Sequence, residues 1–137
     1  MSKTTASTEI LIREGMEGLS AARIATLYRR APLLRPTGDR EAIERMYASS
    51  QLVISAWQDD RLVGLARVLT DGVLYALLAD LAVEPDVQGL GIGKRLIEEM
   101  QSRLKGVELI LRDSDISSGF YQRLGFARVE NAWVKRI

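Results

Sequence analysis

The stretch LAVEPDVQGLGIGK, residues 81–94, decides the fold of this chain. It begins with apolar residues typical of a strand, passes Pro85, and runs through three alternating glycines into residues with helical spacing. Glycine at Gly89, Gly91 and Gly93 lets the backbone approach a ligand closely and permits positive φ angles. Successive N–H groups and the dipole of the following helix then favour a phosphate. The stretch therefore predicts a strand, a turn and a helix that bind a phosphorylated ligand.

Two common phosphate-binding loops do not fit these residues. A Walker A loop around Gly93 and Lys94 requires glycine at position 88 and Ser or Thr at position 95, where the chain has Gln88 and Arg95. A dinucleotide fingerprint requires glycine at position 94 or 96, where the chain has Lys94 and Leu96. ATP and NAD are thus disfavoured as ligands. The plainer alternative, that the glycines only make a tight strand-to-helix connection, stays open at this point.

Composition indicates one domain and excludes several kinds of chemistry. The 137 residues are 47% hydrophobic, which predicts a single folded domain over residues 10–137. Residues 1–9 are mostly polar and predict a loose leader. A net charge of +1 provides no global field for nucleic acid or an anionic membrane. No apolar run is long enough to cross a bilayer, so a cytoplasmic location is expected.

The chain has no cysteine and no histidine. Their absence removes thiolate nucleophiles, imidazole bases and zinc sites built from these residues, so no metal is expected. Proton transfer must therefore use Asp, Glu, Tyr, Lys or water.

The first half of the chain alternates between strand and helix periodicity. Residues 10–13 predict a short strand, and residues 19–30 carry apolar side chains at helical spacing. Asp39 is placed to cap a second helix. Period-two alternation over residues 51–57 and 62–70, around a polar turn, predicts an antiparallel hairpin.

The second half predicts a long buried strand and the elements that follow it. Residues 73–83 are mostly apolar and predict a central strand covered on both faces. A helix is expected to run from the glycine turn to about Leu104. Residues 107–113 then predict a strand, residues 117–124 a short helix, and residues 126–137 a final strand pair. The fold class is mixed α/β, with strands mostly sequential and antiparallel before the glycine turn.

Two ordered motifs give the chain a family resemblance. The first follows the pattern Gln/Arg-x-x-Gly-x-Gly/Ala through Gln88, Gly91 and Gly93. The second, GFYQRLGF over residues 119–126, is similar to a C-terminal Tyr-x-x-x-Gly-Phe signature. Together they resemble the GNAT superfamily of N-acyltransferases, and the resemblance extends from about residue 10 to the C-terminus. It implies a GNAT-type fold, with a twisted, mostly antiparallel α+β sheet flanked by about four helices.

The resemblance also implies acetyl-CoA as cosubstrate and assigns its binding residues. It implies that the pantetheine arm pairs with the strand at Leu81, Ala82 and Val83. The pyrophosphate would bind to backbone amides of a run that comprises Gln88, Gly89, Leu90, Gly91, Ile92, Gly93 and Lys94. Ser114 stands where many family members have an asparagine that contacts CoA, so this position departs from the family pattern and is either a single hydrogen-bond partner or a helix cap.

Two residues are candidates for proton transfer. Tyr121 matches the position of the family's tyrosine near the CoA sulfur, which implies a general acid; the alternative is a packing tyrosine beneath Gly125. Asp80 is the only charge inside its own, otherwise apolar strand, which makes it a candidate base, directly or through water. The alternative is that Asp80 faces a cation or caps a loop.

The leading functional hypothesis is acetyl transfer to the primary amine of a small molecule, by direct attack in a ternary complex. The motifs also resemble small family members related to the serotonin and arylalkylamine acetyltransferases of chloroplasts and cyanobacteria. Two alternatives stay open: acetylation of a protein lysine or N-terminus, and a non-catalytic acyl-CoA-binding module. A homodimer is expected from the apolar C-terminal segment.

Overall fold

The computed structural model describes residues 9–114 and 118–137. Four strands form an antiparallel series: β1 (Leu11–Glu14), β2 (Leu52–Gln58), β3 (Arg61–Thr70) and β4 (Tyr75–Val83). The fifth, β5 (Glu108–Leu111), pairs with β4 in parallel, so the sheet order is β1-β2-β3-β4-β5. The expected mostly antiparallel sheet is confirmed. The leader expected over residues 1–9 lies outside the described residues except for Glu9.

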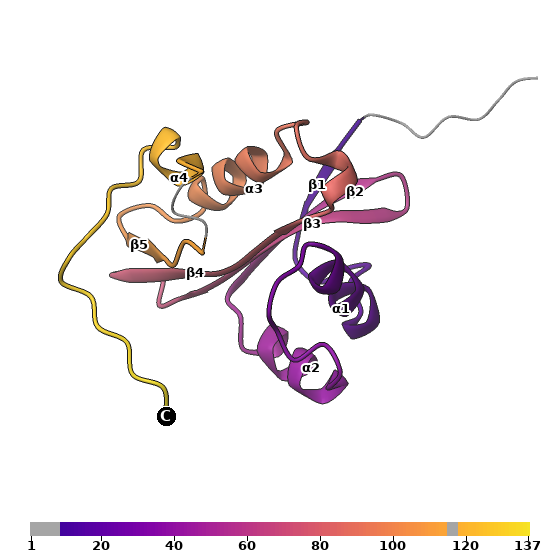
Figure 1. Ribbon diagram of the computed structural model, residues 1–137, viewed down its shortest axis with the longest axis horizontal. Coiled ribbons are helices and arrows are strands. Elements are labelled where there is room, and N and C mark those ends of the chain that lie inside the picture. Colours follow the sequence, from indigo (N-terminus) through magenta and orange to yellow (C-terminus); the bar gives the residue numbers. More distant parts are fainter. Residues whose placement is uncertain (1–8, 115–117) are drawn as a thin grey trace, which may run out of the picture.

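Helices cover both faces of this sheet (Figure 1). One face carries α1 (Ala21–Arg30) and α2 (Arg40–Ala48), and the other carries α3 (Ile92–Gln101) and α4 (Phe120–Arg123). A short 3₁₀ turn, η1 (Pro85–Val87), connects β4 to the glycine turn. The expectation of about four helices in a mixed α/β fold is therefore confirmed.

Local side-chain hydrogen bonds set the ends of several elements. The predicted cap at Asp39 is confirmed, because its carboxylate accepts a hydrogen bond from the Ala42 amide at 3.1 Å. Ser20 caps α1 in the same way through the Arg23 amide. Asp71 accepts backbone hydrogen bonds from the residues that follow it and so closes the turn before β4.

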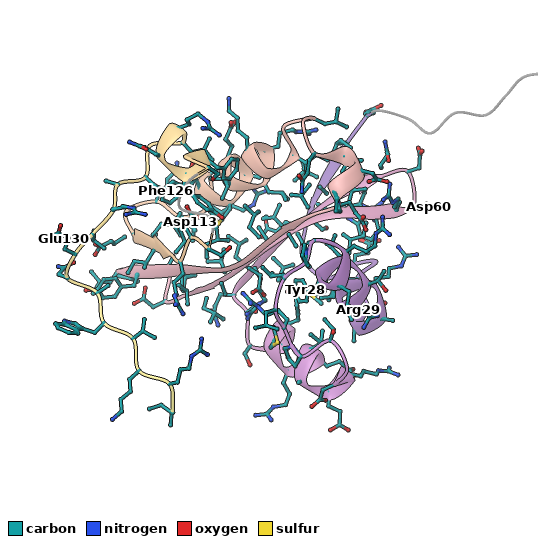
Figure 2. The ribbon with its side chains drawn as sticks, viewed as in Figure 1. Tyr28, Arg29, Asp60, Asp113, Phe126 and Glu130 are labelled. Atoms are coloured by element: carbon teal, nitrogen blue, oxygen red, sulfur yellow. The ribbon has the colours of Figure 1, made fainter. Side chains whose placement is uncertain are left out.

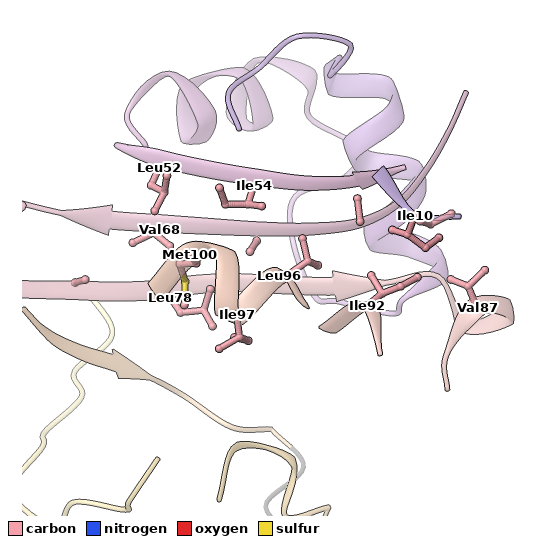
Figure 3. Packing of buried hydrophobic residues seen from close by; sticks show 14 residues of the cluster. Ile10, Leu52, Ile54, Val68, Leu78, Val87, Ile92, Leu96, Ile97 and Met100 are labelled. Carbon is pink, nitrogen blue, oxygen red and sulfur yellow. The ribbon is translucent and has the colours of Figure 1, made fainter. Parts of the chain in front are cut away.

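The sheet separates two apolar clusters. The cluster under α3, drawn in Figure 3, joins the helix to β2, β3 and β4 and includes Ile54, Val63, Leu96, Ile97 and Met100. The cluster under α1 and α2 includes Ile24, Tyr28, Ile43, Trp57 and Leu65. Both sides of β3 are therefore buried, and its seven consecutive buried residues explain the nearly continuous apolar sequence there.

A glycine in β3 lets α3 approach the sheet closely. A Cβ atom added to Gly64 would lie 2.9 Å from Ile92 Cγ2 and 3.0 Å from Leu96 Cδ1. It would also lie 3.2 Å from the Cβ atom of Ala56. Since Ile92 is the first residue of α3, Gly64 determines how close the helix start lies to β3.

Two expectations about the second half of the chain need correction. Residues 126–137 do not form a strand pair: no regular element is assigned to them, and residues 127–137 are all exposed. The physical reason is that no strand of the described chain pairs with them. The strand expected over residues 73–83 begins only at Tyr75, and its first residues are not covered on both faces, because Tyr75 and Leu77 are exposed.

Among the described helices, none combines the length and the apolar character that a membrane span requires.

The Gly64→Ala substitution is expected to destabilise the fold by about 1–3 kcal/mol, because the added methyl group overpacks the contact with Ile92 and Leu96. Urea unfolding measures the change. The control is Gly38→Ala, where the added Cβ meets nothing within 4 Å and φ is not in the left-handed region. Equal stability of the two variants would show that α3 does not depend on this close approach.

Candidate functional site

β4 and β5 separate beyond the short stretch where they pair. Their parallel pairing joins Tyr75–Leu78 of β4 to β5, with Leu78 opposite Leu111 as the last pair. The outer edge of β4 from residue 79 to residue 83 pairs with no strand of the described chain. This edge includes Leu81, Ala82 and Val83, and its peptide groups are available to an extended, amide-containing ligand.

The glycine turn lies at the end of this free edge. Gly89 and Gly91 have φ angles of 95° and 75°, in the left-handed region that favours glycine. Gly91 is the N-cap of α3 and provides no side-chain hydrogen bond to the helix. The first N–H groups of a helix have no intrahelical acceptor. The N–H groups at the start of α3 therefore point toward the turn, where they can donate hydrogen bonds to an anion.

Buried residues lie on either side of the turn. Val87 and Ile92 are 5% and 2% exposed and belong to the cluster under α3 (Figure 3). Between them, Gln88, Gly89 and Leu90 are exposed. The turn therefore exposes its backbone to solvent between two buried residues.

Glu84 anchors the approach to the turn from the other face. Its amide donates to the Val63 carbonyl at 2.8 Å, and its buried carboxylate pairs with Arg30 of α1 at 2.6 Å and with Arg61 of β3 at 3.2 Å. The end of β4 is therefore tied to α1 as well as to β3.

Gly93 brings the second sequence motif to the first. A Cβ atom at Gly93 would lie 3.2 Å from Phe120 Cζ, so the glycine allows α4 to pack on the first turn of α3. The sequence motif suggested a ligand-facing role for Gly93, and this contact gives it a packing role as well. The CoA-binding assignment of residues 88–94 stays a prediction.

Tyr121 lies on α4, half-buried against the cluster under α3. Its ring makes edge contacts with Phe120 at 5.0 Å and with Phe126 at 5.7 Å between ring centroids. Leu81 and Val83 pack against the same cluster, so Tyr121 lies on the same face of the sheet as these two side chains. Burial, and secondarily the charge of Asp113, raise the pKa of Tyr121 above its ordinary value. The phenol therefore stays protonated at neutral pH, as a general acid requires.

Ser114 is exposed in a bend after β5. Asp113 and Phe126 lie on the α3 and α4 side of the sheet, whereas Tyr28 lies on the α1 side (Figure 2). The structure thus places Tyr121 and the glycine turn on one side of the sheet and Asp80 in a different environment.

Asp80 is surrounded by three donors in the layer between β4 and α1. It is 2% exposed. Its Oδ1 accepts from Arg35 Nε at 2.5 Å, and its Oδ2 accepts from Arg67 Nε at 2.5 Å and from the Tyr28 hydroxyl at 2.7 Å. Arg35 also donates to the Ala79 carbonyl at 2.8 Å. The assignment of Asp80 as a base stays a prediction, and these contacts favour the alternative in which it faces cations.

Two tyrosines extend this polar cluster. The hydroxyls of Tyr28 and Tyr47 share a short hydrogen bond, and Arg67 lies over the Tyr47 ring at 5.7 Å. Burial raises the pKa of both tyrosines; the nearby negative charge of Asp80 raises them further. Both phenols therefore stay neutral and serve as donors within the cluster.

The partners of Asp80 were not predicted from the sequence. The available signal was Arg67, which is also a lone charge inside an apolar strand, and β3 and β4 place Arg67 opposite Asp80. Arg35 had no such signal, because it lies in the loop between α1 and α2.

Two surface hollows lie away from the glycine turn. One, of about 590 Å³, is lined by α1 and the β2–β3 hairpin and includes Arg30, Arg61 and Glu84. The other, of about 490 Å³, lies beside it around Arg23 and Trp57. Neither of these two hollows includes Tyr121 or a glycine of the turn. Within the described residues, no group of three Asp or Glu side chains is arranged to hold a metal ion.

Comparison with known proteins identifies relatives of this arrangement. The family model described as an acetyltransferase (GNAT) domain matches residues 34–136. Serotonin N-acetyltransferase 2 of rice, a protein named as chloroplastic, is 31% identical over 126 residues. That match covers 85% of this chain and 60% of the rice protein, so the chain spans less than two thirds of this relative.

Solved structures share the fold. A probable acetyltransferase from Staphylococcus aureus superposes with a TM-score of 0.80 at 20% identity, over 93% of this chain and 100% of that one. An N-acetyltransferase from Thermoplasma acidophilum, solved in complex with coenzyme A, superposes with a TM-score of 0.67 at 21% identity, over 91% and 93% of the two chains.

The Asp80→Asn substitution is expected to destabilise the fold by about 3–5 kcal/mol, because it leaves two guanidinium groups without their buried counter-charge. Urea unfolding is the measurement. Asp86→Asn is the matched control: that carboxylate is exposed and pairs with Arg61, so little change is expected. A fully stable Asp80→Asn variant with lost activity would instead favour the role of a base.

Proposed function

Because this chain belongs to the GNAT acetyltransferase family, we propose that it transfers an acetyl group from acetyl-CoA to the primary amine of a small molecule. The observation that carries the proposal is the free edge of β4 beside the uncapped start of α3. An extended amide chain that ends in a pyrophosphate matches these two features in order. The pantetheine arm would pair along residues 81–83, and the pyrophosphate would accept from amides of residues 88–94.

The proposed reaction is direct attack in a ternary complex. The neutral amine attacks the thioester carbonyl, the new C–N bond forms, and the C–S bond breaks. The amine loses one proton, and the departing thiolate gains one. Tyr121 is the proposed donor of that second proton, because its phenol is half-buried and stays protonated. A solvent water is a simpler acceptor for the amine proton than Asp80, whose oxygens already accept from three donors.

The acceptor is proposed to be a small amine. Support comes from the rice relative, which is named serotonin N-acetyltransferase and of which this chain spans 60%. The loop between α1 and α2 would form one side of the acceptor site, where Arg35 ties it to β4. A cytoplasmic location also stays a prediction.

Gly91→Ala is expected to weaken binding of CoA about tenfold, because a non-glycine residue at φ 75° is strained and relaxation would turn the first amides of α3 away. Isothermal titration calorimetry with CoA measures the affinity. Gly72→Ala is the matched control, since Gly72 has φ 76° but lies in the turn before β4. Equal affinities in the two variants would remove the glycine turn as the pyrophosphate site.

Tyr121→Phe is expected to lower kcat by a factor of about 10²–10⁴ while leaving the affinity for CoA unchanged. Release of CoA thiol is followed with tryptamine, serotonin and polyamines as acceptors. Gln122→Ala is the control, because Gln122 is exposed on the same helix. Unchanged turnover in Tyr121→Phe would remove the general-acid assignment. Binding of CoA without thiol release from any amine would favour a protein acceptor or a non-catalytic module.

A further inference from the structure

The carboxylate of Asp80 pairs with two cations that extend from different kinds of element. Arg67 extends from β3, the strand beside β4, and its side chain is 9% exposed. Arg35 extends from the loop between α1 and α2, and its side chain is 28% exposed. The side chain of Asp80 is itself 0% exposed. Arg35 is therefore the partner that borders solvent, and a movement of the loop would release it without moving a strand.

Arg35 also binds the backbone of β4 at an irregular position. Its Nη2 donates to the Ala79 carbonyl at 2.8 Å. The register of β3 against β4 shifts here, so Ala79 is an extra residue of β4 between the pairs formed by Leu78 and Asp80. The parallel pairing of β4 with β5 ends at Leu78. Two acceptors, Asp80 Oδ1 and the Ala79 carbonyl, thus converge on one cation at the point where the edge of β4 becomes free.

This cation lies where the acyl end of acetyl-CoA is expected. The proposed pyrophosphate site comprises residues 88–94, and the proposed pantetheine stretch comprises residues 81–83. The donor would therefore run from the glycine turn back along β4, with its acyl end toward residues 79 and 80. Since a strand rises about 3.3 Å per residue, Ala79 lies about 7 Å along β4 from Leu81. An attacking amine has to arrive at this end of the donor, and the guanidinium of Arg35 already lies there.

A primary ammonium group has the chemistry that could replace this guanidinium. Both groups carry one positive charge and several N–H donors, and neither has an acceptor. When Arg35 leaves, Asp80 Oδ2 keeps the hydrogen bonds from Arg67 and Tyr28, while Oδ1 and the Ala79 carbonyl are left to receive an ammonium group. A neutral alcohol supplies one donor and no charge, so it would replace Arg35 poorly.

We propose that Arg35 occupies the subsite that binds the ammonium group of the acceptor, and that the acceptor enters by displacing Arg35 from Asp80 and Ala79. The inference rests on the proposed acetyl transfer to a small amine. Arg35 determines specificity in two ways: it selects for ligands with a positive charge, and it lowers the apparent affinity for every amine. The second effect arises because an amine binds only those molecules from which Arg35 has been displaced.

Isothermal titration calorimetry with tryptamine tests the displacement on the chain saturated with CoA, which carries no acetyl group and so allows no turnover. Arg35→Ala is expected to bind tryptamine about tenfold more tightly than the unmodified chain, since no side chain has to leave first. Arg29→Ala is the matched control. Arg29 also connects α1 to the loop, through the Thr37 carbonyl at 3.3 Å, but its affinity for tryptamine is expected to stay unchanged because this contact is remote from Asp80.

Tryptophol, the neutral alcohol with the same ring, separates the effect of charge from the effect of space. It is expected to gain much less affinity than tryptamine in Arg35→Ala. An equal gain for tryptophol would show that the substitution only opens space, and would overturn the ammonium subsite.

The folded state of the variant is checked by circular dichroism. Asp80 keeps Arg67 and Tyr28 as partners in Arg35→Ala, so the fold is expected to persist. Arg35→Gln is the second variant if Arg35→Ala unfolds. A measurement on the unmodified chain needs no substitution: the ¹⁵N–¹H signal of Arg35 Nε is expected to shift on titration with tryptamine, and an unchanged signal at saturation would contradict displacement.

The inference and the proposed function fail in different ways. Equal or weaker binding of tryptamine by Arg35→Ala would overturn the subsite, even where acetyl transfer to an amine is observed. So would a lack of binding of tryptamine, serotonin and polyamines by every chain. Tighter binding by Arg35→Ala, with no CoA thiol released from acetyl-CoA by any amine, would instead remove the proposed acetyl transfer and support the subsite.

Discussion

The buried carboxylate of Asp80 is the constraint that joins the two layers of this molecule. It lies on β4, and its partners come from three other places: Tyr28 from α1, Arg67 from β3, and Arg35 from the loop between α1 and α2. A buried ion pair of this kind contributes little net stability over an apolar contact, but loss of one partner is costly. The cluster therefore specifies position more than it adds stability. It fixes where the α1–α2 loop lies relative to the free edge of β4.

Close packing on the opposite face of the sheet positions the part of the site that is proposed to bind acetyl-CoA, called the donor side below. Gly64 admits the start of α3 to the sheet, and Gly93 admits Phe120 of α4 to the start of α3. A Cβ atom at either position would require its neighbours to shift. Gly64 therefore determines how closely the start of α3 lies to β3. Gly93 determines how closely α4, which carries Tyr121, packs on α3. Packing between these elements alone therefore positions the start of α3 and Tyr121, without a contribution from a ligand.

The sequence predicted those parts of the molecule that local periodicity and turn chemistry determine. The cap at Asp39 and the hairpin of β2 and β3 follow from neighbouring residues, and both are confirmed. The partners of Asp80 did not follow, because Arg35 is distant in the chain and carries no local pattern. The contact of Gly93 with Phe120 was missed for the same reason. The expected strand pair at residues 126–137 was wrong, because periodicity indicates strand character but does not supply a partner strand.

The two halves of the proposed site differ in what they require of the sequence. The donor side consists of peptide groups on β4 and at the start of α3, so it requires glycines and buried neighbours rather than particular polar side chains. Such a requirement survives extensive substitution, which is consistent with a shared fold at about one-fifth sequence identity. The acceptor side depends on side chains of the α1–α2 loop and on whatever faces the free edge of β4. Those side chains take no part in the packing that holds the turn, so the motif that predicts acetyl-CoA as the donor does not predict the acceptor.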